Sequence, residues 1–260
     1  MTDNTLTTQQ MVAPEVEAPE TVEGYWVLHD FRRVDWPRWR SLPEDTRSLF
    51  LEELVGFLGE CASVEAVERG GSSRAYRVIT QKADLAIIHF RPDPAQLFDL
   101  QAELSRCGIA DFLLPAYSYF SVIELSLYRS PSSRPEVMER RLYPRIPDRR
   151  YMCFYPMNKR RGERYNWYDL PASERREMMK GHGRVGHKYA EQVTQIITGS
   201  QGLDDWEWGV TLFADHPIHF KKLVYEMRFD PASSRYAEFG PFYIGMTASP
   251  QDITALLLGR

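Results

Sequence analysis

DLAIIHFRPDPAQLFDLQAEL, residues 84–104, and WEWGVTLFADHPIHFKKLVYEM, residues 206–227, are two copies of one pattern. In each copy an apolar run leads to a phenylalanine, Phe90 or Phe213, and a proline follows four residues later. Apolar positions then recur at spacings of three and four, which is typical of an amphipathic helix. Each copy is therefore predicted to be a strand followed by a helix, and the recurrence indicates an internal duplication.

The elements around the two copies complete a repeated unit. In the first half, residues 25–128, strands are expected at 25–33, 73–79, 84–90 and within 112–128, and helices at 43–61 and from 93 onward. In the second half, residues 151–260, strands are expected at 151–159, 206–213 and 240–246, and helices at 171–192 and 217–229. Each half then resembles the β-α-β-β-α-β order of a ferredoxin-like unit. We therefore expect an α+β fold, a duplicated ferredoxin-like chain whose two sheets form an α+β barrel.

Composition restricts the class of protein. The chain has 260 residues, 43% of them hydrophobic and 26% charged, with a formal net charge of −4. This balance gives no support for nucleic-acid binding, which requires a basic surface. No apolar run approaches the roughly 18 residues that cross a bilayer, so we expect no membrane span. Cys61, Cys107 and Cys153 form no Cys-x-x-Cys pair, which argues against a disulfide framework or a structural zinc site.

Residues 1–24 differ from the rest of the chain. They contain five acidic residues and no Lys or Arg. Without a basic start or an apolar segment they do not fit a secretory signal. We expect a flexible acidic tail here, and a cytoplasmic protein.

The segment YPMNK, residues 155–159, is a candidate binding wall. If it is extended, the period of two places Tyr155, Met157 and Lys159 on one face of the strand. A phenol, a thioether and an ammonium group would then line the same side of a site.

A helix predicted from Pro171 onward carries His182 in the middle of one stripe, four residues after Met178. Three glycines surround this histidine, at 181, 183 and 186, and each costs roughly 0.5–1 kcal/mol relative to alanine in a helix interior. A flat, bulky ligand lying against the helix would explain them, with His182 as a proximal haem ligand. The alternative is a packed or solvated histidine at a helix break.

The linker at residues 129–150 is rich in arginine and proline. Its prolines, at 131, 135, 144 and 147, are expected to prevent a regular helix or central strand. Such a segment is either a solvated linker or a flap that offers positive charge to an anionic ligand.

Three stretches closely resemble the chlorite dismutase superfamily, and within it the coproheme decarboxylases. They are YPMNKRRGERYNWY from Tyr155, HGRVGHKYAEQVTQIITGSQGLDDWEWGVTLF from His182, and YEMRFDPASSRYAEFGPFYIG from Tyr225. The resemblance implies a duplicated ferredoxin-like fold and a homopentamer. It also implies conversion of iron coproporphyrin III (coproheme) to haem b, with hydrogen peroxide as oxidant and loss of two carbon dioxide molecules. An upstream coproporphyrin ferrochelatase is then a candidate partner.

The same resemblance implies roles for individual residues. His182 is the expected iron ligand, and Tyr155 is the expected catalytic tyrosine, whose radical takes a hydrogen atom from a propionate. The other expected contacts to the porphyrin or its propionates come from Arg141, Met157, Lys159, Gln195, Arg228 and Ser233. His187 departs from the family pattern, in which an arginine is expected. Tyr117 and Tyr119 are further candidates for a propionate contact, without an assigned place.

Two other functions compete with decarboxylation. The first is chlorite dismutation or general peroxidase activity; the neutral amide of Gln195 argues against it, because an arginine is expected there to assist an oxyanion. The second is a haem carrier or sensor without catalysis. Tyr155 argues against that function, because simple carriage needs no redox-active phenol.

Overall fold

The strands of the computed structural model form one antiparallel sheet. The structure describes residues 18–126 and 134–259. Its strands are β1 (Thr21–Val34), β2 (Ser72–Val78), β3 (Leu85–Arg91), β4 (Leu113–Ser126), β5 (Tyr151–Lys159), β6 (Thr194–Gly199), β7 (Trp208–Ala214), β8 (Ala237–Phe239) and β9 (Tyr243–Thr247). Its helices are α1 (Trp36–Ser41), α2 (Glu44–Ser63), α3 (Pro94–Arg106), α4 (Pro135–Leu142), α5 (Ala172–Lys188), α6 (Ile218–Met227), α7 (Pro231–Ser234) and α8 (Pro250–Leu258).

The strand order confirms the predicted duplication. The first half has the order β4-β1-β3-β2 and the second half has the equivalent order β9-β5-β7-β6. Pairing of β4 with β6 and of β2 with β9 joins the two sheets at both edges, so that the strands close into a barrel. Among the described strands, such closure leaves no long free edge.

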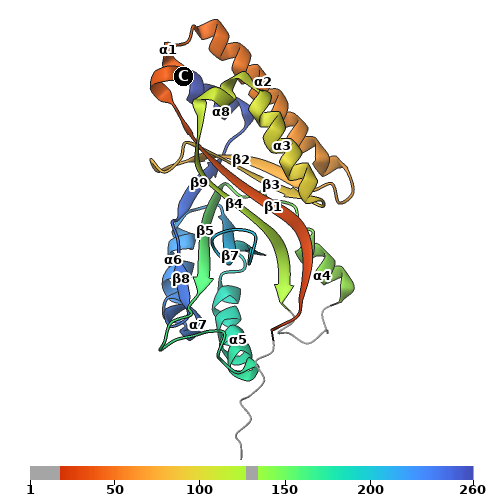
Figure 1. Cartoon of the computed structure of the whole chain (residues 1–260), viewed down its shortest axis with the longest axis vertical. Helices are drawn as coiled ribbons and strands as arrows, with labels where there is room; N and C mark the ends of the chain where they lie inside the picture. Colours follow the sequence, from red (N-terminus) through yellow and green to blue (C-terminus); the bar gives the residue numbers. More distant parts are fainter. Residues whose placement is uncertain (1–17, 127–133, 260) are drawn as a thin grey trace, which may run out of the picture.

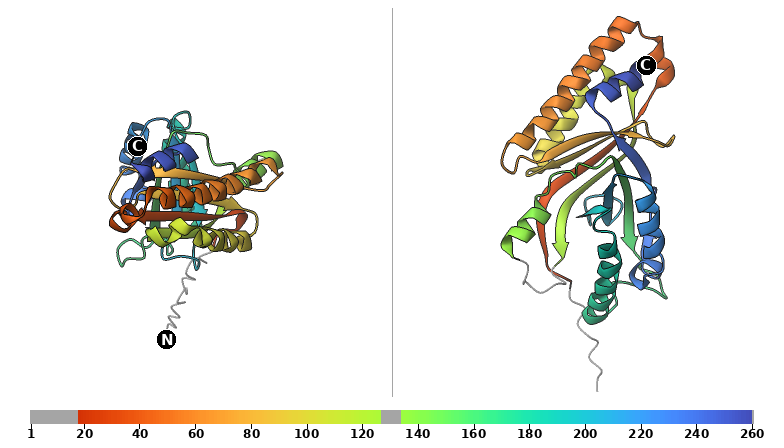
Figure 2. Two further views of the ribbon diagram at one scale, coloured as in Figure 1. Left: turned by 90° about the horizontal axis from the view of Figure 1, so that it is seen from above. Right: turned by 180° about the vertical axis from the view of Figure 1, so that it is seen from behind.

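Three of the apolar clusters pack the sheet against itself and against its helices. Inside the barrel, aromatic and aliphatic side chains of both halves meet around Phe31 and Phe154, both fully buried. Helices α2, α3 and α8 cover the outer face of the first half. Helix α6 packs on the outer face of the second half, around Leu212 and Phe220. Figures 1 and 2 show the two groups of helices at opposite ends of an elongated molecule.

Local chemistry explains why the repeated helices begin where the sequence predicts. The Asp93 carboxylate accepts a hydrogen bond from the backbone N–H of Ala95, and Pro94 occupies the first turn of α3. The apolar stripe of α3, Leu97, Leu100 and Leu104, is buried. The matching α6 residues Phe220 and Leu223 are buried as well.

The structure corrects several expectations. Residues 135–142 form helix α4, although Pro135 was expected to prevent a helix; proline is tolerated there because it occupies the first turn. Order begins at Thr21 or earlier, because Thr21 to Glu23 pair with β4, so these residues are not part of a flexible tail. The strands β6 and β8 and the helices α1 and α8 were not predicted. Residues 1–17 of the expected tail and 129–133 of the linker lie outside the described residues.

Within residues 18–126 and 134–259, no helix is both long and apolar enough to cross a bilayer.

Candidate functional site

The outer face of the second half of the sheet forms the floor of the candidate site. Side chains alternate along β5, so Tyr155 and Met157 lie on the face that α6 covers. The register places Met157 beside Trp208 of β7 and beside Phe239 of β8. Gly199 of β6 lies next to Trp208. Phe239, Met157, Trp208 and Gly199 therefore form a row across four strands, which we call the floor row.

Tyr155 is held rigidly in an apolar setting. Its side chain is 8% exposed and stacks on Phe242, with ring centroids 4.4 Å apart and an angle of 24° between the planes. Phe239 lies on another side at 5.8 Å. Burial raises the pKa of the phenol, and the charge of Arg228 opposes this only in part. The phenol is therefore neutral near physiological pH and keeps its proton.

Lys159 ends β5 and is half-buried. Its ammonium group donates to the carbonyl oxygen of Ala232 at 3.2 Å and lies 4.2 Å from the centre of the Trp167 ring. Burial lowers its pKa to about 8, while the charges of Asp230 and Glu207 act in the opposite direction. A lysine with this pKa is mostly a cation at neutral pH and loses its charge in the mildly alkaline range.

His182 is oriented by a buried carboxylate. Its Nδ1 lies 2.9 Å from Oδ2 of Asp230, whose side chain is 5% exposed. The same carboxylate accepts from the backbone N–H of Ser233 and begins the short helix α7. We assign the proton to Nδ1 from this pairing, which leaves the lone pair of Nε2 available. A carboxylate behind the second ring nitrogen is the usual support of a metal-binding histidine.

Asp230 was not among the site residues predicted from the sequence. Its signal was present in the motif RFDPASSR, because Asp followed by Pro is a common start of a helix. The pairing with His182, 48 residues away in the chain, follows only from the packing of α5 against α7.

Helix α5 packs closely against the sheet at Gly186. A Cβ atom added there would lie 3.2 Å from Nε2 of Gln195 on β6 and 3.4 Å from Cε of Met227. At Gly181 the nearest atoms would lie at 3.9 Å, which is an ordinary contact. The close contacts with Gln195 and Met227 therefore explain why a glycine is present at position 186, whereas position 181 has room for a side chain. Gln195 is thus placed one helical turn beyond His182.

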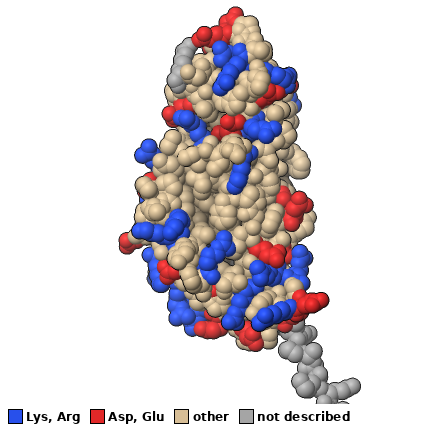
Figure 3. All heavy atoms as spheres, turned by 90° about the vertical axis from the view of Figure 1, so that its left-hand side faces the viewer, with Lys and Arg blue, Asp and Glu red and all other residues tan. Residues whose placement is uncertain are grey.

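A cleft of about 570 Å³ opens beside α6, α7 and β8. We call it the Arg228 cleft; its lining residues are Arg160, Arg228, Ser233, Ser234, Ala237, Glu238 and Phe239. The guanidinium carbon of Arg228 lies 3.7 Å from the centre of the Phe239 ring, at one end of the floor row. Figure 3 looks onto the side with α6 and shows Lys and Arg gathered over its lower part, among some acidic side chains.

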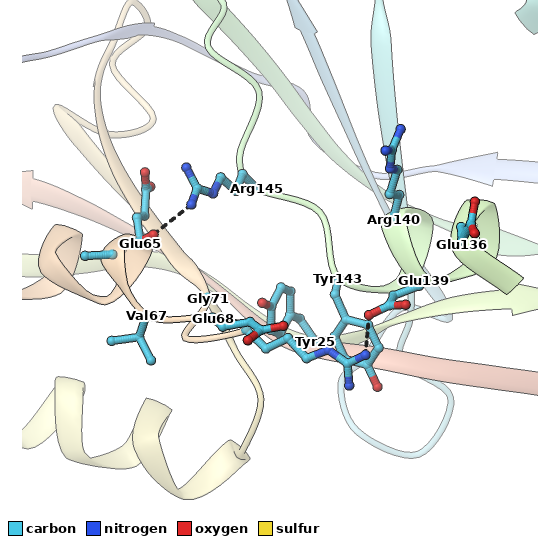
Figure 4. A pocket seen from close by; sticks show the side chains of 12 residues that line it. Tyr25, Glu65, Val67, Glu68, Gly71, Glu136, Glu139, Arg140, Tyr143 and Arg145 are labelled. Atoms are coloured by element: carbon cyan, nitrogen blue, oxygen red, sulfur yellow. Dashed lines mark hydrogen bonds and ion pairs between the residues drawn. The ribbon is translucent and has the colours of Figure 1, made fainter.

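A larger cleft, of about 660 Å³, lies between α4 and the loop before β2. Figure 4 shows acidic and basic side chains mixed around it. Arg69 and Glu139 of this cleft form an ion pair. Arg145 donates to the backbone carbonyl of Glu65. The cleft holds four glutamates, at 65, 68, 136 and 139, against three arginines, at 69, 140 and 145, and contains none of the predicted site residues. We therefore place the functional site in the second half of the sheet.

The structure groups the predicted residues unequally. The second half of the chain carries Tyr155, Met157, Lys159, His182, Gln195, Arg228 and Ser233 on or near the face that α5, α6 and α7 cover. Arg141 is exposed on α4, which lies on the other side of the barrel end from α6 and α7 (Figures 1 and 2). His187 is exposed near the end of α5.

Tyr117 and Tyr119 face the barrel interior and not this site. The Tyr119 hydroxyl donates to the backbone carbonyl of Trp206 at 3.1 Å. Tyr117 stacks on Tyr243 with ring centroids 5.5 Å apart. Both side chains belong to the interior cluster, so neither reaches the outer face in this structure.

Comparison with known proteins places this arrangement in a family. Residues 47–248 match the family model described as chlorite dismutase, and the chain belongs to this family. This confirms the resemblance drawn from the sequence. A mutant chlorite dismutase from Candidatus Nitrospira defluvii shares the fold, with a TM-score of 0.75 at 18% identity over 91% of this chain and 96% of that one.

More similar relatives are known. A protein of Thermus thermophilus named coproheme decarboxylase is 48% identical over 243 residues, which cover 93% of this chain and 97% of the relative. A coproheme decarboxylase of Staphylococcus carnosus is 47% identical over 235 residues, covering 88% and 94%. The solved structure of a heme-binding protein from Thermus thermophilus has a TM-score of 0.90 at 47% identity and covers 94% of this chain and 99% of its own.

Proposed function

We propose that this protein is a coproheme decarboxylase, which converts two propionate groups of iron coproporphyrin III to vinyl groups and so produces haem b. The observation that carries the proposal is the His182–Asp230 pair, together with a buried tyrosine, Tyr155, in the same half of the chain. The names of relatives at 47–48% identity over most of the chain support it.

The residues present fit an iron porphyrin that carries carboxylates. Nε2 of His182 would hold the iron, because its other ring nitrogen is already paired with a carboxylate. Arg228, Ser233 and Lys159 would bind propionates through charge-assisted or neutral hydrogen bonds. Met157 and the rest of the floor row offer apolar contact to the ring. We propose Gln195 and Arg141 as further contacts to the porphyrin. The contact from Arg141 requires that helix α4, which carries this residue, lies close to the bound ring.

The chain's own groups then have separate tasks. When bound, the iron of the substrate supplies the oxidising chemistry, with hydrogen peroxide as the proposed oxidant. Tyr155 holds a proton on its phenol and, as a radical, takes a hydrogen atom from a propionate. Phe239 and Phe242 keep water away from that phenol. Lys159 and Arg228 hold carboxylates in place, so that one propionate is presented at a time.

The decisive experiment measures product mass. Purified protein is incubated with iron coproporphyrin III and hydrogen peroxide, and the porphyrin is analysed by mass spectrometry. Each conversion removes one carbon dioxide and two hydrogens, so a species with three carboxylates should precede haem b. A porphyrin that binds but keeps its mass would refute the decarboxylase and favour a carrier or sensor.

Arg228→Ala should weaken coproheme binding by about tenfold or more, because a hydrogen bond to a charged group contributes about 1.5–3 kcal/mol. Haem b, which has half as many carboxylates, should be affected less. Absorbance titration of both porphyrins measures the difference. Arg106→Ala, an exposed substitution on α3, is the matched control and should change neither affinity. Equal losses for both porphyrins would show that Arg228 contacts neither of the two propionates that coproheme has and haem b lacks.

Coproheme affinity should fall as pH rises through about 8, the range in which Lys159 loses its proton. A bound carboxylate favours the ammonium form, so above this pH binding must take up a proton, and affinity decreases by up to about tenfold per pH unit. Titrations across this range in the wild type and in Lys159→Gln measure the effect. The Gln variant should bind more weakly below pH 8 and show a flatter profile. An unchanged slope in that variant would assign the titration to another group.

A further inference from the structure

The floor row has a carboxyl group at the end opposite the Arg228 cleft. Ile123 of β4 faces the barrel interior, so its neighbour Glu124 faces outward, as Gly199 does. The Glu124 carboxyl group lies over Gly199; a Cβ added to that glycine would lie 2.3 Å from Oε2. Trp208 of the floor row donates from Nε1 to Oε1 of Glu124 at 3.1 Å. The glycine and the indole thus fix this half-buried carboxyl group on the floor.

The charges at the two ends of the row are opposite. At the β8 end, Arg228 lies against Phe239, and Lys159 is on the adjacent strand. At the β4 end, Glu124 lies directly across the strand pair from a second carboxylate, Glu23 of β1. Burial raises the pKa of Glu124, the hydrogen bond from Trp208 lowers it, and the charge of Glu23 raises it. From Phe239 on β8 to Gly199 on β6 the floor row spans three strand spacings, or about 14 Å, with cations at the Phe239 end and carboxyl groups at the Gly199 end.

We propose that Glu124 is a specificity-determining residue, which turns porphyrin carboxylates away from the β4 end of the floor and so fixes the in-plane orientation of the bound ring. This inference rests on the proposed function. A propionate beside an ionised Glu124 would bring two like charges together in a partly buried setting, which is unfavourable. The ring edge without carboxylates should therefore lie against Glu124.

The type III isomer of coproporphyrin has such an edge. Its methyl groups occupy adjacent positions on two neighbouring pyrroles, so one edge of the ring carries methyl groups alone. In the type I isomer, methyl and propionate alternate around the ring, and every edge carries a propionate. Glu124 should therefore favour the type III isomer over the type I isomer, which has the same size and the same charge.

The test compares the two iron porphyrins in binding, without peroxide. Full-length protein is titrated with iron coproporphyrin III and iron coproporphyrin I at mildly alkaline pH, where a glutamate is ionised. We expect the wild type to prefer type III by about tenfold, the scale of one screened like-charge contact. In Glu124→Gln this preference should disappear, mainly through tighter binding of type I. The Gln amide oxygen can still accept from Trp208, so the substitution removes charge and keeps the hydrogen bond.

Two further variants keep the test decisive. Glu60→Gln, an exposed substitution on α2, should leave the preference unchanged. Glu23→Gln removes the neighbouring charge at an exposed position and should reduce the preference by a smaller factor, even if Glu124→Gln fails to fold. A preference that survives both substitutions, or a wild type that binds the two isomers equally, refutes the role of Glu124 alone. A wild type that binds neither isomer refutes the proposed function as well.

Discussion

Tyr155→Phe is expected to bind coproheme with near wild-type affinity and to produce no haem b. The substitution removes one hydroxyl group and keeps the ring that stacks on Phe242. Loss of a hydrogen bond changes binding by about 0.5–1.5 kcal/mol. A phenyl ring has no O–H bond from which a radical can form under these conditions, so hydrogen abstraction from the propionate should stop. Binding and chemistry are therefore separated at this residue.

Absorbance titration and product mass together measure this separation. The variant should accumulate neither haem b nor the species with three carboxylates, while its affinity stays within about tenfold of the wild type. Tyr236→Phe is a matched control, because this buried tyrosine lies in the separate cluster around Trp167. It should retain turnover. Haem b formation by Tyr155→Phe at close to the wild-type rate would reduce Tyr155 to a packing residue and contradict the mechanism.

The fold was predictable because the sequence repeats its pattern. A strand, a proline-marked turn and a helix recur in residues 84–104 and 206–227, and local signals of this kind determine local structure. The strand at 151–159 was predicted with its observed bounds. The closure of the barrel was less accessible, since it depends on pairing of β4 with β6, and β6 was not predicted.

Weak local signals explain the missed elements. Strand β6 has six residues and follows the predicted helix without a strong helix breaker between them. Its two adjacent apolar residues were therefore not recognised as part of a separate strand. Strand β8 has only three residues and exists because it pairs with the end of β5. Helix α4 was not predicted because the prolines of the linker were expected to prevent a helix. Proline is tolerated in the first turn of a helix, which is where Pro135 lies.

In the candidate site, too, features set by neighbouring residues were predictable from the sequence, and contacts between distant residues were not. The shared face of Tyr155 and Met157 follows from the period of a strand, so the sequence alone predicts it. The pairing of His182 with Asp230 joins two helices that are distant in sequence, and no local pattern encodes that contact. The position of Arg141 on α4, away from α6 and α7, likewise depends on how the linker packs.

His182→Ala is expected to abolish the iron–histidine signature of the coproheme complex. The substitution removes the ring whose Nε2 is left available by the carboxylate of Asp230. Resonance Raman or magnetic circular dichroism of the bound porphyrin reports this bond directly. Added imidazole should restore a nitrogen-ligated spectrum in the variant, because the space of the missing ring becomes free. An unchanged signature in His182→Ala would assign the iron to another residue.

Asp230→Asn tests the support of that histidine with the ring still in place. Asparagine caps helices as well as aspartate does, so α7 should persist. The amide carries no charge, so Nε2 of His182 should become a weaker donor to iron. Loss of such a supporting carboxylate usually reduces metal affinity or activity by about 10- to 100-fold. We expect a loss in this range together with a lower iron–histidine stretching frequency, whereas a merely structural role for Asp230 would leave that frequency unchanged.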